Sequence, residues 1–271
     1  IFEGKKLGFL VLNFIAGETL GEKISREKIE SIYDLKQIVS AVLNGLNYLH
    51  SLPETIIHNE ITPQNIMLDL SGDIPQAKII DFGFARSFHQ SSKAYNKEGL
   101  NLNYVASECF NSFYSPQSDL FSVGAVMYQL LFGMPPWFKD ISKFKADRTK
   151  AEDVIIEERK KPISFPKVSE DIVDFDDSIL KVLKKALQND PENRFQSANE
   201  FTQALNDVIE IKDVDTVQKV KSDDKGEKKI KTQKVKGKGF DAIAGLDELK
   251  KEMKRSVIDV LQNPEKAERY G

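Results

Sequence analysis

Two short stretches of the sequence decide the fold. Residues 57–68 read IHNEITPQNIML, and residues 79–83 read IIDFG. The apolar runs 66–68 and 77–80 have the length of short strands, and the turn-forming residues Ser71, Gly72 and Asp73 lie between them. We therefore expect a β-hairpin with a polar loop just before its first strand and an Asp-Phe-Gly sequence just after its second.

Polar residues flank this hairpin in a pattern suited to phosphoryl transfer. Glu60 and Asn65 precede the first strand and Asp81 follows the second, so the hairpin brings all three to one end. Carboxylate and carboxamide oxygens are hard ligands that suit Mg²⁺. In phosphoryl transfer the protein mainly positions metal ions against the charge that spreads over the phosphate oxygens. The spacing therefore indicates a nucleotide-phosphate site.

Helical patterns dominate the rest of residues 1–210. Residues 32–51 carry one broad apolar stripe, and the nearly all-apolar run 119–132 predicts a helix buried on most sides. Residues 177–189 are amphipathic, and Ser197 with Glu200 forms a capping box that opens a last helix, to about residue 209. Residues 9–12 read as a buried strand that Ala16 and Gly17 end. These elements predict an α+β fold that is mostly α.

Composition narrows the class of protein. The chain has 271 residues and a net charge of −3, so no global field attracts it to nucleic acid. Cys109 is the single cysteine, which excludes a disulfide framework and favours a reducing, cytoplasmic location. We expect Cys109 to be a packing residue, and His50 and His89 to lie at the surface. No apolar run reaches the roughly 18 residues of a membrane helix, so we expect no membrane segment.

Three zones differ in composition. Residues 1–210 read as a folded domain, residues 211–239 as a Lys-rich flexible linker, and residues 240–271 as structured again. The basic run 228–238 could bind nucleic acid or acidic lipid, but a solvated tether is the favoured interpretation.

The two opening stretches resemble the catalytic loop and the Asp-Phe-Gly motif of eukaryotic-type Ser/Thr protein kinases. That resemblance implies ATP and Mg²⁺ as cofactors, with Asn65 and Asp81 as metal ligands. It also implies that His58 is a structural core histidine and that Phe82 and Gly83 complete the motif. The match covers residues 1 to about 210.

Further landmarks of that family follow in the family's order. Ala106-Ser107-Glu108 resembles the Ala-Pro-Glu that closes the activation segment, and Asp119 resembles the aspartate of the central helix that braces the catalytic loop. Arg194 resembles the arginine that pairs with that glutamate, here Glu108. The resemblance therefore implies the helical C-terminal lobe of a kinase, preceded by the last small-lobe strand or strands and the hinge, with most of the small lobe missing.

The same resemblance implies a nucleotide-binding role for residues near the hinge. Leu12 would be the gatekeeper, the backbone of Asn13 and Ile15 would face adenine, and Met67 would form the floor under the base. Without the resemblance, the apolar residues among them would be ordinary core.

The catalytic loop departs from the family pattern His-Arg-Asp-Leu-Lys-Pro-x-Asn. Glu60 stands at the position of the catalytic base, and a misplacement of about 1 Å can cost roughly 10²-fold in rate. Thr62 replaces the phosphate-holding lysine, a loss that typically costs about 10²–10³-fold. Asn101 stands at the position of the threonine that links these two, and Asn59 replaces the arginine that receives a phosphorylated activation segment.

Three functions remain open on this pattern. The favoured one is a nucleotide-binding pseudokinase, or strongly impaired kinase, with a protein partner or substrate and a regulatory or scaffolding role for a fused AAA+ ATPase. The second is an active Ser/Thr protein kinase that uses Glu60 as its base. The third is an interaction module that binds no nucleotide. We expect the fragment by itself not to catalyse transfer.

The last zone resembles a second family. Residues 240–250 read FDAIAGLDELK and lead toward Tyr270-Gly271, which is similar to the lead-in of AAA+ ATPase domains. The alternative is a generic amphipathic helix after a linker. The resemblance implies that the kinase-like domain regulates a fused AAA+ ATPase.

Overall fold

The computed structural model describes residues 12–72, 75–88, 100–144, 147–207 and 211. The chain divides into two units, one formed by residues 15–221 and the other by residues 1–14 with 222–271. All helices and strands below belong to the larger unit. Residues 9–11 of the predicted first strand, and the predicted segments 212–239 and 240–271, lie outside the described residues.

The described part of the chain is mostly helical, with two small antiparallel sheets. The helices are α1 (Leu20–Arg26), α2 (Ile32–Ser51), α3 (Pro116–Phe132), α4 (Arg148–Arg159), α5 (Ser178–Ala186) and α6 (Ala198–Leu205). The strands are β1 (Gly17–Thr19), β2 (Ile56–Ile57), β3 (Ile66–Asp69), β4 (Gln76–Ile79) and β5 (Arg86–Ser87). Short 3₁₀ turns lie at Pro63–Asn65, Ser107–Asn111, Ser142–Phe144 and Pro191–Asn193. The sheets have the strand orders β1-β3-β4 and β2-β5.

Helix α2 has the bounds that its apolar stripe predicts. Ser31 caps it, because its hydroxyl accepts a hydrogen bond from the backbone N–H of Asp34 at 3.1 Å. The stripe is buried from Ile32 to Leu49 and packs against α3, α6 and β4. This contact places the hairpin on the helical body.

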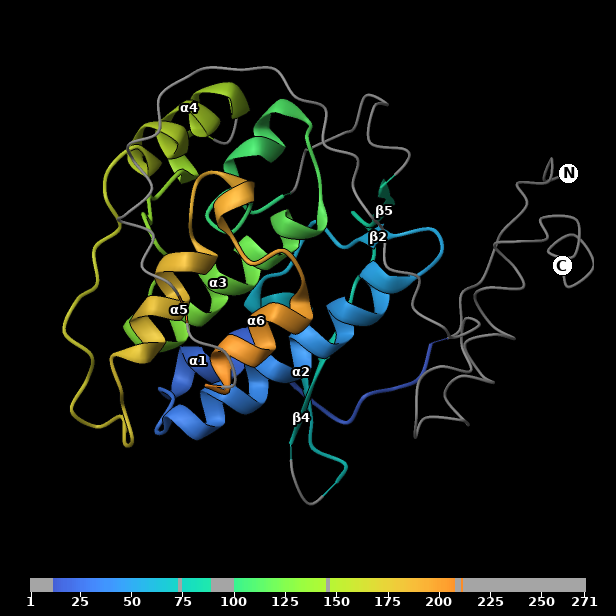
Figure 1. Cartoon of the computed structure of the whole chain (residues 1–271), viewed down its shortest axis with the longest axis vertical. Coiled ribbons are helices and arrows are strands. Elements are labelled where there is room, and N and C mark those ends of the chain that lie inside the picture. The colour runs from blue at the N-terminus through green and yellow to red at the C-terminus, as the bar shows by residue number, and fades with distance from the viewer. Residues whose placement is uncertain (1–11, 73–74, 89–99, 145–146, 208–210, 212–271) are drawn as a thin grey trace, which may run out of the picture. The chain divides into compact units, whose positions relative to one another are not determined.

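Helix α3 is the central helix that its composition predicts, and Figure 1 shows it among α2, α5 and α6. It begins at Pro116, three residues before the predicted start, because Ser115 and Ser118 form a capping box there. Gly124 lets α5 approach closely, since a Cβ at this position would lie 2.9 Å from the Cβ of Ala186. The helix ends at Gly133, whose φ of 81° suits glycine.

The hairpin is confirmed, and Gly17, which was expected only to end the strand at residues 9–12, begins a strand of its own. Strands β3 and β4 pair with Met67 opposite Lys78, and β1 adds a third strand in which Gly17 lies opposite Asp69. A Cβ at Gly17 would lie 1.8 Å from the carbonyl oxygen of Leu68, so the glycine allows the strands to approach. The reciprocal bonds of Thr19 and Glu22 then open α1, which was not predicted.

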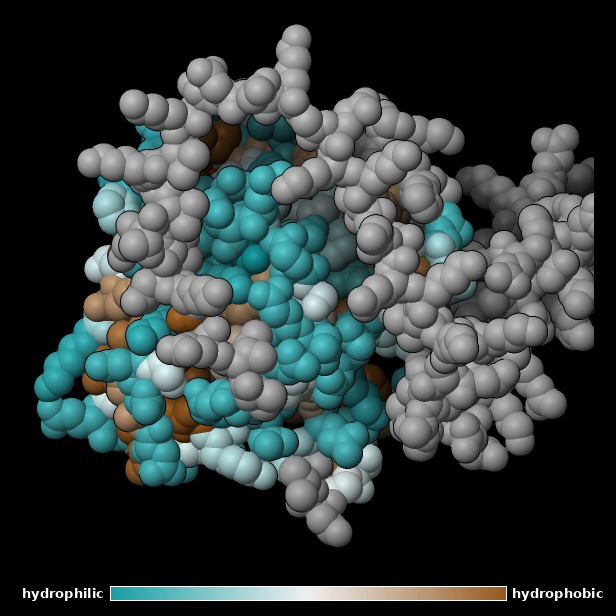
Figure 2. Space-filling model, viewed as in Figure 1, coloured by the Kyte–Doolittle hydropathy of each residue, from teal (hydrophilic) through white to brown (hydrophobic). Residues whose placement is uncertain are grey.

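Other boundaries also differ from the prediction. Helix α5 ends at Ala186 and α6 at Leu205, each earlier than expected, and α4 was missed. Ser197 caps α6 as predicted, whereas the carboxylate of Glu200 accepts from Gln196, one residue earlier than a capping box requires. None of the helices in the described ranges has the length and apolarity needed to cross a membrane. On the face seen in Figure 2, hydrophilic side chains cover the middle of the described surface.

Candidate active site

The loop before β3 is held in place by the buried carboxylate of Asp119. Asp119, on the first turn of α3, is fully buried, and its two oxygens accept the backbone N–H groups of His58 and Asn59 at 2.8 Å each. The Nε2 atom of His50 lies 2.9 Å from the same carboxylate. A buried charge is stable only when it is well hydrogen-bonded, and here three groups surround it. Asp119 therefore sets the path of the loop that carries Glu60.

The hairpin brings the two predicted metal ligands to one end. The backbone N–H of Ile80 donates to the carbonyl of Asn65 at 2.9 Å. Asp81 is the next residue after Ile80, so it lies at the same end of the hairpin as Asn65. The amide nitrogen of Asn65 donates to the carbonyl of Glu60 at 3.0 Å, which leaves its side-chain oxygen for another partner. Asp81 is exposed, with a φ of 62°, and one of its oxygens accepts from the N–H of Gly83 at 2.9 Å.

These donors fit a magnesium ion that is shared with a phosphate ligand. Mg²⁺ is usually held by one or two carboxylates, with water and substrate phosphates as its remaining ligands. One carboxylate and one carboxamide oxygen meet that pattern. Within the described ranges, no cluster of three or more His, Cys, Asp or Glu side chains could hold a metal ion.

Glu60 is half-buried beside Asn65 and Asp81. Burial raises the pKa of its carboxyl group, the Asn65 side chain opposes that shift, and the negative charge of Asp81 adds to it. The backbone N–H of Glu60 donates to Nδ1 of His58 at 3.3 Å, and the His58 ring is fully buried. Burial lowers the pKa of His58, so its ring is held in the neutral form.

Thr62 and Asn101 do not join Glu60 in a hydrogen-bonded cluster. Thr62 is buried at the start of a 3₁₀ turn, and its hydroxyl makes no capping bond there. The side-chain oxygen of Asn101 accepts from the backbone N–H of Asn103 at 3.3 Å. For the residues that the structure describes, no hydrogen bond connects Asn101 with Glu60 or Thr62. The three positions therefore lack the link that the sequence resemblance implies for them.

The segment after Asp81 is held by the loop before β3. The ring centroids of His58 and Phe82 lie 5.0 Å apart in an edge-to-face arrangement. The amide nitrogen of Asn59 donates to the carbonyl oxygen of Phe84 at 2.9 Å. Phe82 remains half-exposed, with 50% of its surface accessible. Two consecutive loop residues thus contact the chain on either side of Gly83.

Glu108 and Arg194 form a buried ion pair. The two Nη atoms of Arg194 donate to the two carboxylate oxygens of Glu108 at 2.7 and 2.9 Å. Its remaining donors reach the carbonyls of Gln188, Asn189 and Gln117. This arrangement ties the end of the segment 100–108 to the turn before α6.

The four predicted nucleotide contacts fall in both units of the chain. Leu12 and Asn13 belong to the smaller unit, while Ile15 and Met67 belong to the larger one. Met67 is partly buried in the middle of β3, opposite Thr19 of β1.

Two buried basic residues were missed from the sequence. The expectation that His50 lies at the surface is wrong, because its side chain is only 9% exposed and contacts Asp119. Its position four residues after Leu46, on the edge of the α2 stripe, could have indicated burial. Arg159, at the end of α4, is buried, and its guanidinium donates to the Leu102 carbonyl at 2.9 Å and the Ser107 hydroxyl at 3.4 Å. Burial lowers the pKa of Arg159 to about 9.

Cys109 agrees with its predicted packing role. It is buried, and burial raises the pKa of its thiol to about 12. The thiol is therefore protonated at neutral pH and unreactive.

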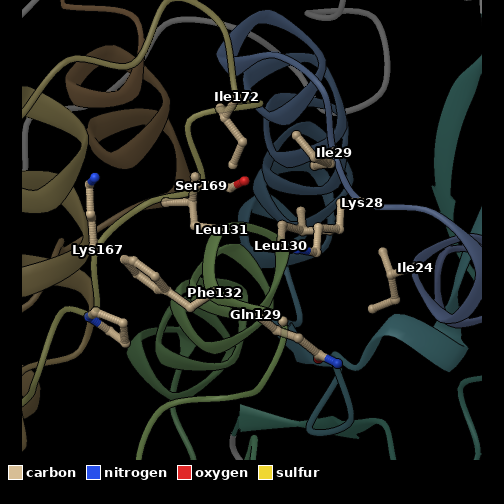
Figure 3. A pocket seen from close by; sticks show the side chains of 12 residues that line it. Ile24, Lys28, Ile29, Gln129, Leu130, Leu131, Phe132, Lys167, Ser169 and Ile172 are labelled. Carbon is tan, nitrogen blue, oxygen red and sulfur yellow. The ribbon is translucent and has the colours of Figure 1, made fainter.

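Two cavities lie apart from the hairpin end. One, of about 410 Å³, is lined by residues 101–103 together with apolar side chains that include Phe138, Ile141 and Phe144. The other, of about 330 Å³, lies between α1, the end of α3 and residues 166–172 (Figure 3). Neither is lined by Glu60, Asn65 or Asp81.

Comparison with known proteins matches residues 1–208 to the family model described as "Protein kinase domain". The chain is 30% identical over 203 residues to the "Probable serine/threonine-protein kinase PknB" of Bifidobacterium longum, which covers 73% of this chain and 27% of that protein. It is 29% identical over 199 residues to the "Serine/threonine-protein kinase PknB" of Mycobacterium leprae, and this match covers 72% of this chain and 29% of that protein. A match to "Calcium-dependent protein kinase 4" of Plasmodium falciparum is 30% identical over 173 residues and covers 57% of this chain and 32% of that protein. The chain thus spans about a third or less of the length of these relatives.

Proposed function

The chain belongs to the protein kinase domain family, and from that premise we propose that it is an ATP- and Mg²⁺-binding pseudokinase or strongly impaired kinase. The observation that carries this proposal is the contrast at the hairpin end. Asn65 and Asp81 lie at the same end of the hairpin and carry oxygens suited to a cation, whereas Glu60, Thr62 and Asn101 share no hydrogen bond among the described residues.

The roles of the residues follow from this geometry. A magnesium ion at the site would neutralise charge on the phosphates of the nucleotide. Asn65 is oriented for this by its own bond to Glu60, and Asp81 by its bond to Gly83. Glu60 can accept a proton from a hydroxyl substrate, but no lysine stands at position 62 to hold the transferred phosphate. Binding is therefore expected to survive better than transfer.

A protein ligand is also part of this proposal. The cavity of about 410 Å³ beside residues 101–103 is lined by aromatic and aliphatic side chains and by Lys139 and Arg148. A concave apolar surface with a few charged groups suits a side chain of a bound polypeptide. We place a partner or substrate protein there.

The relation to a motor domain belongs to the same proposal. Residues 240–271 are similar in sequence to the lead-in of AAA+ ATPases, and a Lys-rich run separates them from the kinase domain. The proposed role of the kinase-like domain is to regulate, or to recruit partners for, such a fused ATPase.

The test is a comparison of variants in the full-length protein. The wild type should show an increased melting temperature with Mg²⁺–ATP but little phosphate transfer, and Asp81→Ala should lose the shift. The matched control is Asp153→Ala, which removes an exposed carboxylate from α4 and should change neither result. Combining Glu60→Asp, Thr62→Lys and Asn101→Thr should raise transfer by at least about 10²-fold.

Two outcomes would favour the other functions. Transfer by the wild type at ordinary kinase rates, abolished by Asp81→Ala, would show an active kinase that uses Glu60. No shift of the melting temperature with Mg²⁺–ATP would favour an interaction module that binds no nucleotide.

A further inference from the structure

Asn59 occupies an unusual backbone position between the two loops of the candidate site. Its φ of 66° lies in the left-handed region, which asparagine tolerates better than most residues. The side chain and backbone together are only 6% exposed. Its backbone N–H is already used by Asp119 at 2.8 Å. The backbone at Asn59 is therefore held in place, and it sets the direction of the amide side chain.

That side chain spans from one loop to the other. Its nitrogen donates to the carbonyl oxygen of Phe84 at 2.9 Å, across 25 residues of sequence. Phe84 follows Gly83, whose N–H is bonded to the Asp81 carboxylate, and the N–H of Ala85 bonds to the carbonyl of Phe82 at 3.0 Å. The bond from Asn59 therefore fixes the far end of the turn that carries Asp81.

The same carbonyl lies at the start of a longer tethered stretch. Strand β5 pairs with β2, with Arg86 opposite Ile57, and the N–H of Phe88 donates to the carbonyl of Thr55 at 2.8 Å. Phe84 lies between the turn that carries Asp81 and the β2-β5 sheet. The Asn59 side chain bonds to the backbone of Phe84 from the loop before β3. We propose that Asn59 is a positioning residue that locks the Asp81–Phe82–Gly83 turn to the Glu60 loop by this bond.

This proposal deepens the proposed function, because it rests on Asp81 as the metal ligand. It adds that the side-chain amide of Asn59 holds the Asp81–Phe82–Gly83 turn in place. The lock therefore needs no bound ligand and no modification of the segment that follows.

Asn59→Gly is the variant that isolates the bond. Glycine adopts a φ of 66° without strain, so the substitution removes the side chain and leaves the backbone path unstressed. It also removes the Asn59 side-chain oxygen, which is buried and has no hydrogen-bond partner among the described residues, so we expect little loss of global stability. Asp174→Gly is the matched control, because Asp174 is exposed and has a φ of 59°.

The measurement is amide hydrogen exchange of the peptide that covers residues 81–88. We expect exchange there to rise about tenfold in Asn59→Gly, with other core peptides and the Asp174→Gly control unchanged. Asn59→Asp should do the same, since a carboxylate cannot donate to the Phe84 carbonyl. Unchanged exchange in residues 81–88, or a uniform rise across all peptides, would overturn the lock.

Nucleotide binding separates this proposal from the one it rests on. If the turn loosens and Mg²⁺–ATP affinity falls, while magnesium-free affinity changes little, both proposals are supported. If the turn loosens but the wild type binds no Mg²⁺–ATP, the lock stands and the proposed function fails.

Discussion

The structural frame of this domain and the positions proposed for transfer differ in how completely their polar groups are paired. In the frame, Asp119 accepts two backbone N–H groups and lies against His50, and Arg194 uses its guanidinium on Glu108 and three carbonyls. At the transfer positions, Glu60, Thr62 and Asn101 share no hydrogen bond with one another in the described part of the chain. The two regions are joined through the loop that begins at His58.

This difference has a physical cause. The frame residues are buried, so each unpaired donor or acceptor would cost free energy. Glu60 and Asn101 are only partly buried, and water can satisfy groups that the protein does not. We therefore expect the fold to tolerate a substitution at Glu60 or Asn101 better than one in the frame. The comparison teaches that the contacts that hold the frame are separate from those made by the three positions proposed for transfer.

The largest effect is expected in the frame. Arg194→Met would leave the Glu108 carboxylate buried without its cation, which typically costs about 3–5 kcal/mol of unfolding free energy. For a domain of this size we expect the melting temperature to fall by about 10 °C, as measured by calorimetry. The control is Lys36→Met, which breaks the partly exposed Lys36–Asp207 pair and should cost less than about 1 kcal/mol. Equal losses for the two variants would contradict the comparison.

A smaller effect is expected where the frame meets the loop. His50→Phe keeps a ring of similar size but removes one of the three groups around Asp119, so we expect a loss of about 1–2 kcal/mol. Asn47→Ala, at an exposed position of the same helix, serves as the control. Chemical denaturation measures both, and no difference between them would show that His50 does not support Asp119.

The smallest effect, of opposite sign, is expected at Glu60. Because burial raises its pKa in the folded state above 4.5, the folded state binds the proton more tightly than the unfolded state. Its contribution to stability is therefore largest below that value and declines as pH rises through the folded pKa. Glu60→Gln should raise the melting temperature at pH 7 by about 1 °C, a figure kept small because the carboxylate is partly exposed, and should have no effect at pH 4. A lower melting temperature at pH 7 would refute this.

Part of the site could be predicted from sequence because it depends on neighbouring residues. The spacing of residues 57–83 predicted a hairpin, and the bond from Ile80 to Asn65 brings Asn65 and Asp81 to its end. Their role as metal ligands stays a prediction. The contact of Asn59 with Phe84 gave no sequence signal, because two loops meet there through one carbonyl oxygen. Arg159 was missed for a different reason, since a charged residue on a polar helix is normally read as exposed.

The sequence by itself determined helices α2, α3, α5 and α6, the hairpin and the order of the landmark residues, because apolar periodicity, caps and turn residues act over a few positions. Only the tertiary structure decided that Gly17 belongs to a strand, that His50 lies against Asp119, and that Asn59 bonds to Phe84. Those facts depend on which distant backbone groups come to lie within hydrogen-bond distance once the core has packed. The departures of Glu60, Thr62 and Asn101 from the kinase pattern that the sequence resembles were visible in the sequence. The absence of hydrogen bonds between them, within the described ranges, was not.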